Sequence, residues 1–459
     1  MVAIGCDVSG PHHLAARPPG YSDSGAHVIG APWPTTSDRD ADGRLTIAGI
    51  PVTELVDHYE SPLWIVDEDD FRNRCRDYQE AFASAWVAYA SKAWPTAGLM
   101  KIAAEEGLWI DVASAGELYT AQLAGVPGDR IVFHGNNKSV PELEMAARHG
   151  VARVVVDSFE ELDRLEEVGR RVEHVFKVWL RITPGIDAHT HEYVRTGHDD
   201  SKFGFTMSLG LAAEAVRKAL TLERVEVAGL HAHIGSQIFG TDAFEANAEV
   251  LVELMAAIRD EHGVTIGELN VGGGMGIPYN HEDRPVSIAQ YGQAVHAALV
   301  EACADHGLPE PQLAIEPGRA LIAPATITVY EVGTVKHLPG LRTYVSVDGG
   351  MSDNIRPALY GAEHEIILAN RHGSDNLAAV TVVGKHCESG DLVRERASLP
   401  DDIRSGDLVA VAATGAYTAS MASNYNRLPR PAAVLVEDGT SRLLMRRETL
   451  EDLTARDVL

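Results

Sequence analysis

The feature that most constrains the fold of this chain is a regular alternation of strand-like and helical segments between residues 62 and 323. Between the strand-like runs lie segments with apolar residues at helical spacing, such as 141–149, 159–169 and 244–262. Eight strands alternating with helices predict a (β/α)8 TIM barrel; periodicity alone leaves a doubly wound open sheet as the alternative. The eight runs, rich in β-branched and other apolar residues, span 86–93, 108–114, 130–135, 152–158, 175–184, 225–236, 266–274 and 312–320.

The pattern changes on both sides of this region. Residues 1–44 are rich in Gly, Pro, Ser, Asp and His without periodicity, which predicts a flexible lead-in. Residues 45–61 read as a strand and a helix, and we expect them to join a second domain. That domain is a C-terminal β-barrel or sandwich over residues 324–459, because strands separated by turn residues replace the alternation there. The runs that predict it span 326–335, 343–350, 378–386, 407–417, 432–439 and 441–448.

Composition narrows the classes of partner and of environment. The 459 residues include 39 Lys and Arg against 66 Asp and Glu, a net charge of −27 that argues against nucleic acid or an anionic membrane surface as partner. No apolar run approaches the ~20 residues of a membrane helix. The start of the chain lacks the pattern of a secretory signal. Because the four cysteines lack metal-binding or dense disulfide spacing, we expect a cytoplasmic protein.

Polar or glycine-rich groups stand where nearly every barrel strand is predicted to end. In a (β/α)8 barrel the active site lies at the carboxyl ends of the strands. A purely structural barrel would not need such groups there. The ends carry Lys92, Asp111, His134, Asp157, Arg181, His233, the glycines 272–274, Glu316 and Arg319.

Lys92 closes an apolar run that begins at Val87. Burial disfavours the ammonium form of a lysine and can expose a nucleophilic amine, which forms a Schiff base with an aldehyde cofactor. The ordinary explanation of a single such lysine is a surface residue with a buried stem. The groups at the neighbouring strand ends favour the cofactor interpretation.

The run from His231 to Gln237 places two histidines two positions apart, so that both can face one side of a strand. One interpretation is that an imidazole lies against a cofactor ring while Ser236 binds a phosphate. A second is an ordinary core histidine, and a third is a metal site. We predict no metal, because the further candidate ligands match no known metal motif in their spacing: His134, Asp157, His189 and His191.

Two glycine-containing turns follow the last two barrel strands. Gly274 lies in a glycine run, and Gly318 and Arg319 follow Glu316 one strand later. Successive backbone N–H groups can hold a phosphate, and a phosphate site after strands 7 and 8 recurs in such barrels. Glu316 can pair with a pyridine nitrogen and make the ring an electron sink, which is the chemistry of pyridoxal 5'-phosphate (PLP).

Polar clusters also follow strands of the β domain. Arg356, with Tyr360 one turn later, can bind a carboxylate through two hydrogen bonds. Cys387 beside Glu388 can serve as a proton donor next to a recognition carboxylate, whereas a lone cysteine is ordinarily an inert buried thiol. Tyr417 ends a third strand.

An ordered set of motifs resembles the alanine-racemase-fold (fold type III) PLP-dependent decarboxylases. The set consists of YASKA, HIGSQ, GGG, EPGR, IRPALY, CESGD and GAY. Within that group the chain is most similar to the diaminopimelate decarboxylases, and HGNNKS and VGKHCESGD resemble the actinobacterial members. The resemblance runs from about residue 45 to the C-terminus.

The resemblance implies a reaction and a role for each motif residue. The reaction is decarboxylation of meso-2,6-diaminopimelate to L-lysine and CO2, the last step of lysine biosynthesis. Lys92 would hold PLP and Cys387 would donate a proton in a homodimer whose shared sites receive the CESGD loop of the partner. The implied cofactor contacts are Lys92, His233, Ser236, Gly274, Glu316, Gly318, Arg319 and Tyr417; the implied substrate contacts are Arg319, Arg356, Tyr360, Glu388 and Tyr417.

Other functions remain open from the sequence. A decarboxylase of the same fold could act on ornithine, arginine or a carboxylated polyamine, although Glu388 after Cys387 favours a substrate with a distal ammonium and carboxylate. An amino-acid racemase would need a tyrosine as second base. A non-catalytic PLP-binding relative would lack Lys92 or Cys387. Ser91 and Trp94 depart from the family pattern beside Lys92, which bears on the shape of the pocket.

Overall fold

The computed structural model describes residues 29–186 and 200–458, so Cys6, His189 and His191 lie outside the described residues. Eight parallel strands form one sheet that closes on itself, because β8 pairs with β9 and β13 pairs with β5. This closure confirms the predicted barrel and excludes the open sheet. The strands are β5 (Trp86–Ala90), β6 (Trp109–Val112), β7 (Ile131–Phe133), β8 (Arg153–Val156), β9 (Phe176–Thr183), β11 (Val225–His231), β12 (Glu268–Asn270) and β13 (Gln312–Ile315); β10 (Phe205–Thr206) extends the sheet beside β9.

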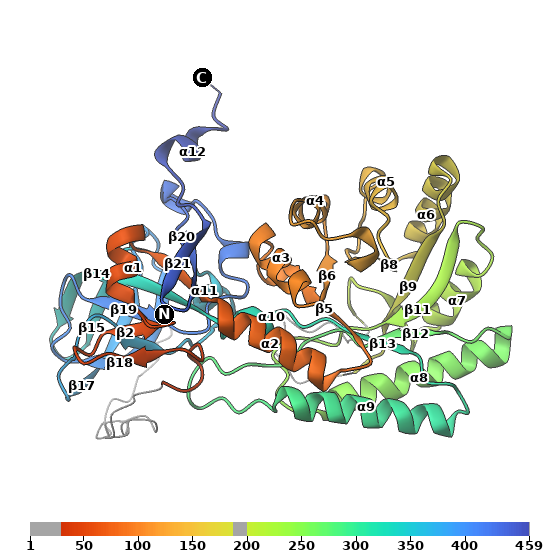
Figure 1. The fold of residues 1–459 in the computed structure, drawn as a ribbon, viewed down its shortest axis with the longest axis horizontal. Coiled ribbons are helices and arrows are strands. Elements are labelled where there is room, and N and C mark those ends of the chain that lie inside the picture. The colour runs from red at the N-terminus through yellow and green to blue at the C-terminus, as the bar shows by residue number, and fades with distance from the viewer. Residues whose placement is uncertain (1–28, 187–199, 459) are drawn as a thin grey trace, which may run out of the picture.

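Helices cover the outside of the barrel (Figure 1). Several begin where a serine or threonine side chain accepts an otherwise unpaired backbone N–H: Thr96, Ser114, Ser158 and Ser287 each do so. The three segments expected to be helical are confirmed. The barrel helices are α2 (Glu68–Ala81), α3 (Ala97–Glu105), α4 (Ala115–Leu123), α5 (Val140–His149), α6 (Phe159–Val172), α7 (Leu211–Ala219), α8 (Asp242–His262), α9 (Ile288–Asp305) and the short α10 (Arg319–Ile322).

Tryptophans fill the barrel near the amino ends of its strands. Trp86 stacks on Trp109 with ring centroids 4.6 Å apart and lies 6.5 Å from Trp179. Trp179 donates its indole N–H to Glu268, which also pairs with Arg153. Because this end is filled, the space for a ligand is left at the carboxyl ends.

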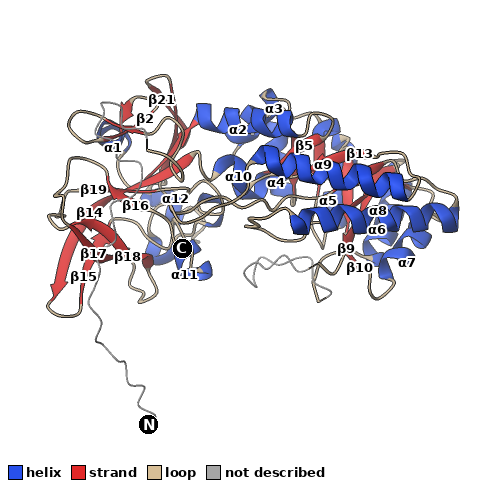
Figure 2. Cartoon of the chain, turned by 90° about the horizontal axis from the view of Figure 1, so that it is seen from below, coloured by secondary structure: helices blue, strands red, loops and turns tan. Residues whose placement is uncertain are grey.

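The β domain lies at one end of the barrel (Figures 1 and 2). Its main sheet has the order β18-β17-β15-β14-β4-β20-β21, with β19 joining β14 and β16. Its elements are β14 (Thr326–Leu338), β15 (Arg342–Val347), α11 (Arg356–Tyr360), β16 (Ile366–Leu368), β17 (Leu377–Val383), β18 (Leu392–Pro400), β19 (Leu408–Val411), β20 (Ala432–Glu437), β21 (Thr440–Met445) and α12 (Leu450–Thr454).

The N-terminal segment joins this domain, as expected for residues 45–61. The strands β1 (Asp38–Arg39), β2 (Leu45–Ile47) and β3 (Ile50–Pro51) form a small sheet, followed by α1 (Val52–Tyr59). Leu45 and Leu55 are buried in the same apolar cluster as Ile327 of β14.

Two expectations about this part of the chain need correction. The flexible lead-in is wrong for residues 29–44, because β1 pairs with β2 and Trp33 is only 3% exposed. The boundary at residue 62 is also wrong: β4 (Leu63–Asp67) pairs with β14 and β20, so the barrel begins at α2. Both errors have the same cause. The structure of these residues is determined by contacts with distant parts of the chain, and short-range periodicity does not report such contacts.

No helix in the described ranges is both long and apolar enough to cross a membrane.

Candidate active site

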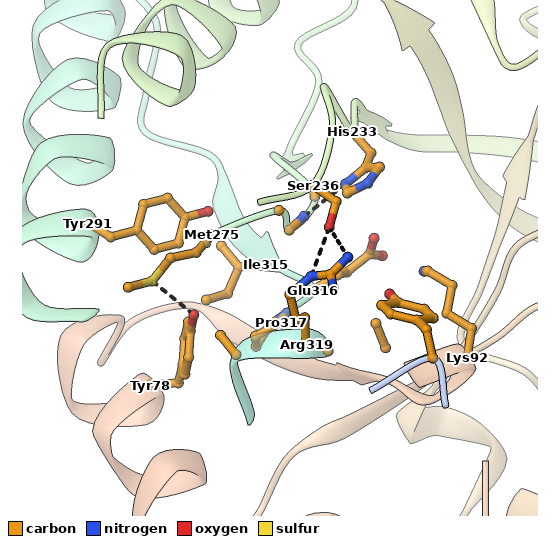
Figure 3. A pocket seen from close by; sticks show the side chains of 17 residues that line it. Tyr78, Lys92, His233, Ser236, Met275, Tyr291, Ile315, Glu316, Pro317 and Arg319 are labelled. Atoms are coloured by element: carbon orange, nitrogen blue, oxygen red, sulfur yellow. Dashed lines mark hydrogen bonds between the residues drawn. The ribbon is translucent and has the colours of Figure 1, made fainter. Parts of the chain in front are cut away.

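A pocket opens at the carboxyl ends of the barrel strands. Lys92 follows β5, His233 follows β11, the glycines 272–274 follow β12, and Glu316 and Arg319 follow β13. Figure 3 shows these side chains around one space. Tyr417 reaches the same pocket from the β domain. All eight residues expected to contact the cofactor line this pocket.

Lys92 does not stand alone in this pocket. Its Nζ lies 2.9 Å from Oδ2 of Asp111, a carboxylate on β6 that is 1% exposed. Burial pushes the pKa of Lys92 down, but the charge of Asp111, with smaller contributions from Tyr417 and Glu316, raises it above its usual value. Burial therefore acts on Lys92 as the sequence analysis expected, but the Asp111 carboxylate opposes it and favours the ammonium form.

Glu316 is buried within a hydrogen-bonded cluster. Its Oε1 lies 2.7 Å from Nε2 of His134 and accepts a 2.7 Å hydrogen bond from Asn270, and its Oε2 lies 3.1 Å from Nε2 of His231. Burial raises the pKa of Glu316, yet the two imidazoles outweigh it and hold the pKa well below its usual range. Burial lowers the pKa of His231 to about 4. The cluster therefore stabilises a charged carboxylate at a buried position.

The same cluster contains two of the histidines that were considered as metal ligands, His134 and His231. Ligand atoms of His134, His231 and Glu316 lie within 4.8 Å of one another, as do no other three among the described residues. Nε2 of both histidines and both carboxylate oxygens of Glu316 already take part in hydrogen bonds within the cluster. His233, two residues after His231, lines the pocket instead.

The pocket is also lined by groups suited to a phosphate. Arg319 donates to Oγ of Ser236 at 2.8 Å, as Figure 3 shows. A Cβ at Gly273 would stand 2.1 Å from the carbonyl oxygen of Glu316, and one at Gly274 2.2 Å from that of Gly235. Because glycine has no Cβ, the turn at Gly273 and Gly274 can approach the backbone of Gly235 and of Glu316 this closely. The backbone amides of these glycines therefore lie beside the pocket.

Arg319 and Tyr417 line the pocket, and Arg356 and Tyr360 lie behind them, with Arg356 6.0 Å from the ring centre of Tyr417. Arg319 lies 4.9 Å from the ring centre of Tyr417, and Arg356 lies 5.2 Å from that of Tyr360. Arg356 is 6% exposed, and its Nε has no hydrogen-bond partner within the described residues. Burial lowers the pKa of Arg356. A buried guanidinium with a free donor is suited to receive a carboxylate.

Tyr279 lies between these two arginines and was missed in the sequence analysis. Its hydroxyl accepts a hydrogen bond from Arg319, and its ring centre lies 5.4 Å from Arg356. Burial raises the pKa of Tyr279, but the two guanidinium groups outweigh this effect and lower it. No motif marks Tyr279, whereas Asn270 could have been found from its position at the end of β12; Asp111 and His134 were named at strand ends, but without these partners.

Cys387 and Glu388 are not brought to this pocket. They lie in the loop 384–391 between β17 and β18, and both are exposed. Within one chain the structure therefore assembles the cofactor and arginine contacts but leaves the expected proton donor outside.

The pocket fits the cofactor that the motifs imply. It offers an amine on Lys92, a buried carboxylate on Glu316 held by two imidazoles, and the hydroxyl of Ser236 with glycine backbone amides. These groups match the aldehyde, the pyridine nitrogen and the phosphate of PLP.

Known proteins show the same combination. Residues 68–323 match the family model described as pyridoxal-dependent decarboxylase, pyridoxal binding domain. The chain is 45% identical to the diaminopimelate decarboxylase of Corynebacterium efficiens, covering 95% of this chain and 96% of that one, and 46% identical to that of Mycobacterium bovis, covering 94% and 99%. The crystal structure of the diaminopimelate decarboxylase of M. jannaschii in complex with L-lysine superposes with a TM-score of 0.87 at 33% identity, covering 93% of this chain and 98% of that one.

Fold, pocket and these likenesses define the class of PLP-dependent amino-acid decarboxylases. Within that class, the chain belongs to the diaminopimelate decarboxylase family.

Proposed function

We propose that this protein decarboxylates meso-2,6-diaminopimelate to L-lysine and CO2 with PLP as cofactor. The observation that carries the proposal is the position of Arg319 and Arg356, joined by Tyr279, beside the pocket that holds Lys92 and Glu316. A decarboxylase must hold the substrate while its reacting carboxylate leaves. Two guanidinium groups suit a substrate that carries a second carboxylate.

The groups of this chain divide the work. Lys92 would bind PLP covalently through its amine, and His233 would lie against the ring. Ser236, Gly274 and the turn of Gly318 would hold the phosphate. Bound PLP supplies an electron sink for the carbanion left when CO2 departs.

The remaining groups would contact the ring of PLP or the substrate. Glu316, kept charged by His134 and His231, would pair with the ring nitrogen. Arg319, Arg356, Tyr360 and Tyr417 would contact the substrate, the arginines through its carboxylate groups.

The proton needed at the α-carbon would come from Cys387, with Glu388 facing the distal ammonium of the substrate. Because both are exposed and outside the pocket of their own chain, we further propose a homodimer in which this loop enters the partner's barrel. A symmetric dimer is the commonest oligomer. We expect the enzyme to act in the cytoplasm, since the thiol of Cys387 must stay reduced to carry a proton.

The test is incubation of the purified, PLP-loaded protein with meso-diaminopimelate, ornithine or arginine, with CO2 and amine products quantified. We expect L-lysine and CO2 in equal amounts from meso-diaminopimelate, and at most trace turnover of the other two. Faster release of CO2 from ornithine or arginine would overturn the substrate assignment while leaving the class intact.

A further inference from the structure

The loop that carries Cys387 is tied down at one buried carboxylate. Asp391, whose side chain is 2% exposed, accepts at Oδ2 from the backbone N–H of His386 at 2.8 Å and lies 2.7 Å from Nδ1 of the same residue. Its Oδ1 accepts the N–H of Met351, in the neighbouring loop, at 2.7 Å. Glycines allow this approach: a Cβ at Gly384 would stand 2.2 Å from Oδ2. Asp391 thus fixes the residue immediately before Cys387.

The imidazole of His386 is held as firmly as its backbone. Its side chain is fully buried, and its ring lies 5.8 Å from that of Tyr425 at an interplanar angle of 13°. Because a carboxylate only accepts, the hydrogen bond to Asp391 assigns the proton to Nδ1. Nε2 is buried and has no hydrogen-bond partner within the described residues.

A third contact reaches Cys387 itself. Its backbone N–H donates to Oδ1 of Asn426 at 2.8 Å. Asn426 has a left-handed backbone, with φ of 52°, a conformation that asparagine adopts more readily than most residues. Its neighbourhood is anchored to the domain, because Arg427 donates its backbone N–H to Asn424 and Ser423 donates to Ser352.

These contacts leave the side chain of Cys387 as the part of the loop that is free. Cys387 and Glu388 are exposed, while the residues that hold the backbone on either side, His386 and Asp391, are buried. A proton donor works only within hydrogen-bond reach of its target, and a displacement of about 1 Å can cost about 10²-fold in rate. A fixed backbone on either side of Cys387 would therefore help to hold its thiol at the required position.

We propose that His386, Asp391 and Asn426 form a clamp that positions Cys387 for proton donation, so that these three are positioning residues for the reaction. The proposal rests on the proposed role of Cys387. His386 acts through its bond to Asp391 and its contact with Tyr425, and Asn426 acts through the amide of Cys387. The alternative is that the same contacts only stabilise the end of the β17–β18 hairpin.

A double-mutant cycle separates the two. His386→Ala and Cys387→Ala are made alone and together in the full-length, PLP-loaded protein, and kcat and KM are measured with meso-diaminopimelate. We expect His386→Ala to lower kcat by about 10-fold to 100-fold with KM and bound PLP unchanged. In the Cys387→Ala background the same change should alter the residual kcat by less than about 2-fold, because the group it positions is gone.

Asn426 supplies a matched pair that does not disturb the buried cluster. Asn426→Gly keeps the left-handed backbone but removes the acceptor, and should lower kcat. Asn426→Asp keeps an acceptor oxygen for Cys387 and should retain wild-type kcat. Lys385→Ala, which removes an exposed side chain from the same loop, is the control and should leave kcat unchanged.

The outcomes distinguish the clamp from the proposed function. An equal loss of kcat from His386→Ala in both backgrounds, or unchanged kcat in both His386→Ala and Asn426→Gly, overturns the clamp while the role of Cys387 stands. Wild-type kcat in Cys387→Ala alone overturns the role of Cys387 and the clamp with it. If His386→Ala does not fold, the Asn426 pair decides by the same criteria.

Discussion

The two parts of the proposed site are built in opposite ways. In the barrel, Lys92, Glu316 and Arg319 are each held by at least one partner side chain at the floor of a pocket. In the β domain, Cys387 and Glu388 stand exposed on a loop that is fixed by the buried side chains of its neighbours His386 and Asp391 and by Asn426. Under the proposed function, the barrel of one chain would bind the cofactor, whereas Cys387 would act only where its loop meets the barrel of a second chain.

The largest effect should come from removing the barrel's amine. Lys92→Ala should abolish covalent PLP binding and lower kcat by about 10³-fold or more, because no other described lysine lines the pocket. Absorbance of bound PLP and its loss on borohydride treatment report the bond. A Lys92→Ala protein in which borohydride still fixed PLP irreversibly to the chain would show that another amine holds the cofactor.

Removing the thiol should produce a different kind of loss. Cys387→Ala should lower kcat by about 10²-fold to 10⁴-fold while the spectrum of bound PLP stays unchanged, because the barrel holds the cofactor without this loop. Cys303→Ala, at a buried thiol of α9, is the matched control and should have no effect. Loss of PLP from Cys387→Ala would contradict the division between the two parts.

The pairing of Lys92 with Asp111 predicts a pH dependence. Since Asp111 raises the pKa of Lys92, the amine is protonated at neutral pH and becomes reactive only as pH rises. PLP uptake by apoenzyme should therefore accelerate with pH, and Asp111→Asn should move the rise to lower pH by about one unit or more. Asp129→Asn, on the exposed turn before β7, should leave the profile in place; an unchanged profile in Asp111→Asn would remove Asp111 from this role.

Tyr279 tests the arginine side of the pocket. Tyr279→Phe should raise KM for meso-diaminopimelate by about 5-fold to 10-fold, the cost of about one hydrogen bond, with kcat little changed. Tyr291→Phe is the control, because that buried hydroxyl has no hydrogen-bond partner in the described part of the chain. An equal rise in KM in both variants would assign the effect to the pocket's volume.

The smallest effect concerns two buried carboxyl groups with opposite surroundings. Glu316 is kept charged by imidazoles, whereas burial raises the pKa of Asp353 in the β domain to about 7. Asp353 then binds its proton more tightly in the folded state than in the unfolded state. The free energy of unfolding should therefore fall as the pH rises from about 4 toward 7. Asp353→Asn should flatten the fall of the melting temperature over this range, and a slope identical to wild type would contradict the assignment.

The sequence predicted the barrel because its signals are local: strand-like runs, helical spacing and capping residues recur within short windows. It predicted Lys92, Glu316 and Arg319 because parallel strands bring their carboxyl ends together. It did not predict that Asp111 pairs with Lys92 or that Tyr279 joins two arginines, since side-chain partners depend on strand register and loop path. It missed β18 because three consecutive charged residues, 394–396, interrupt the apolar pattern there, and it missed the packing of Trp33 because that contact spans the chain.

The central claim is that each complete site draws Lys92 from one chain and Cys387 from another. Mixing the inactive Lys92→Ala and Cys387→Ala proteins under conditions of subunit exchange tests it most directly. Random reassociation at equal amounts makes half of the dimers mixed, each with one intact site, so activity should recover to about a quarter of wild type. Activity that stays at the level of the separate variants after exchange would contradict a shared site.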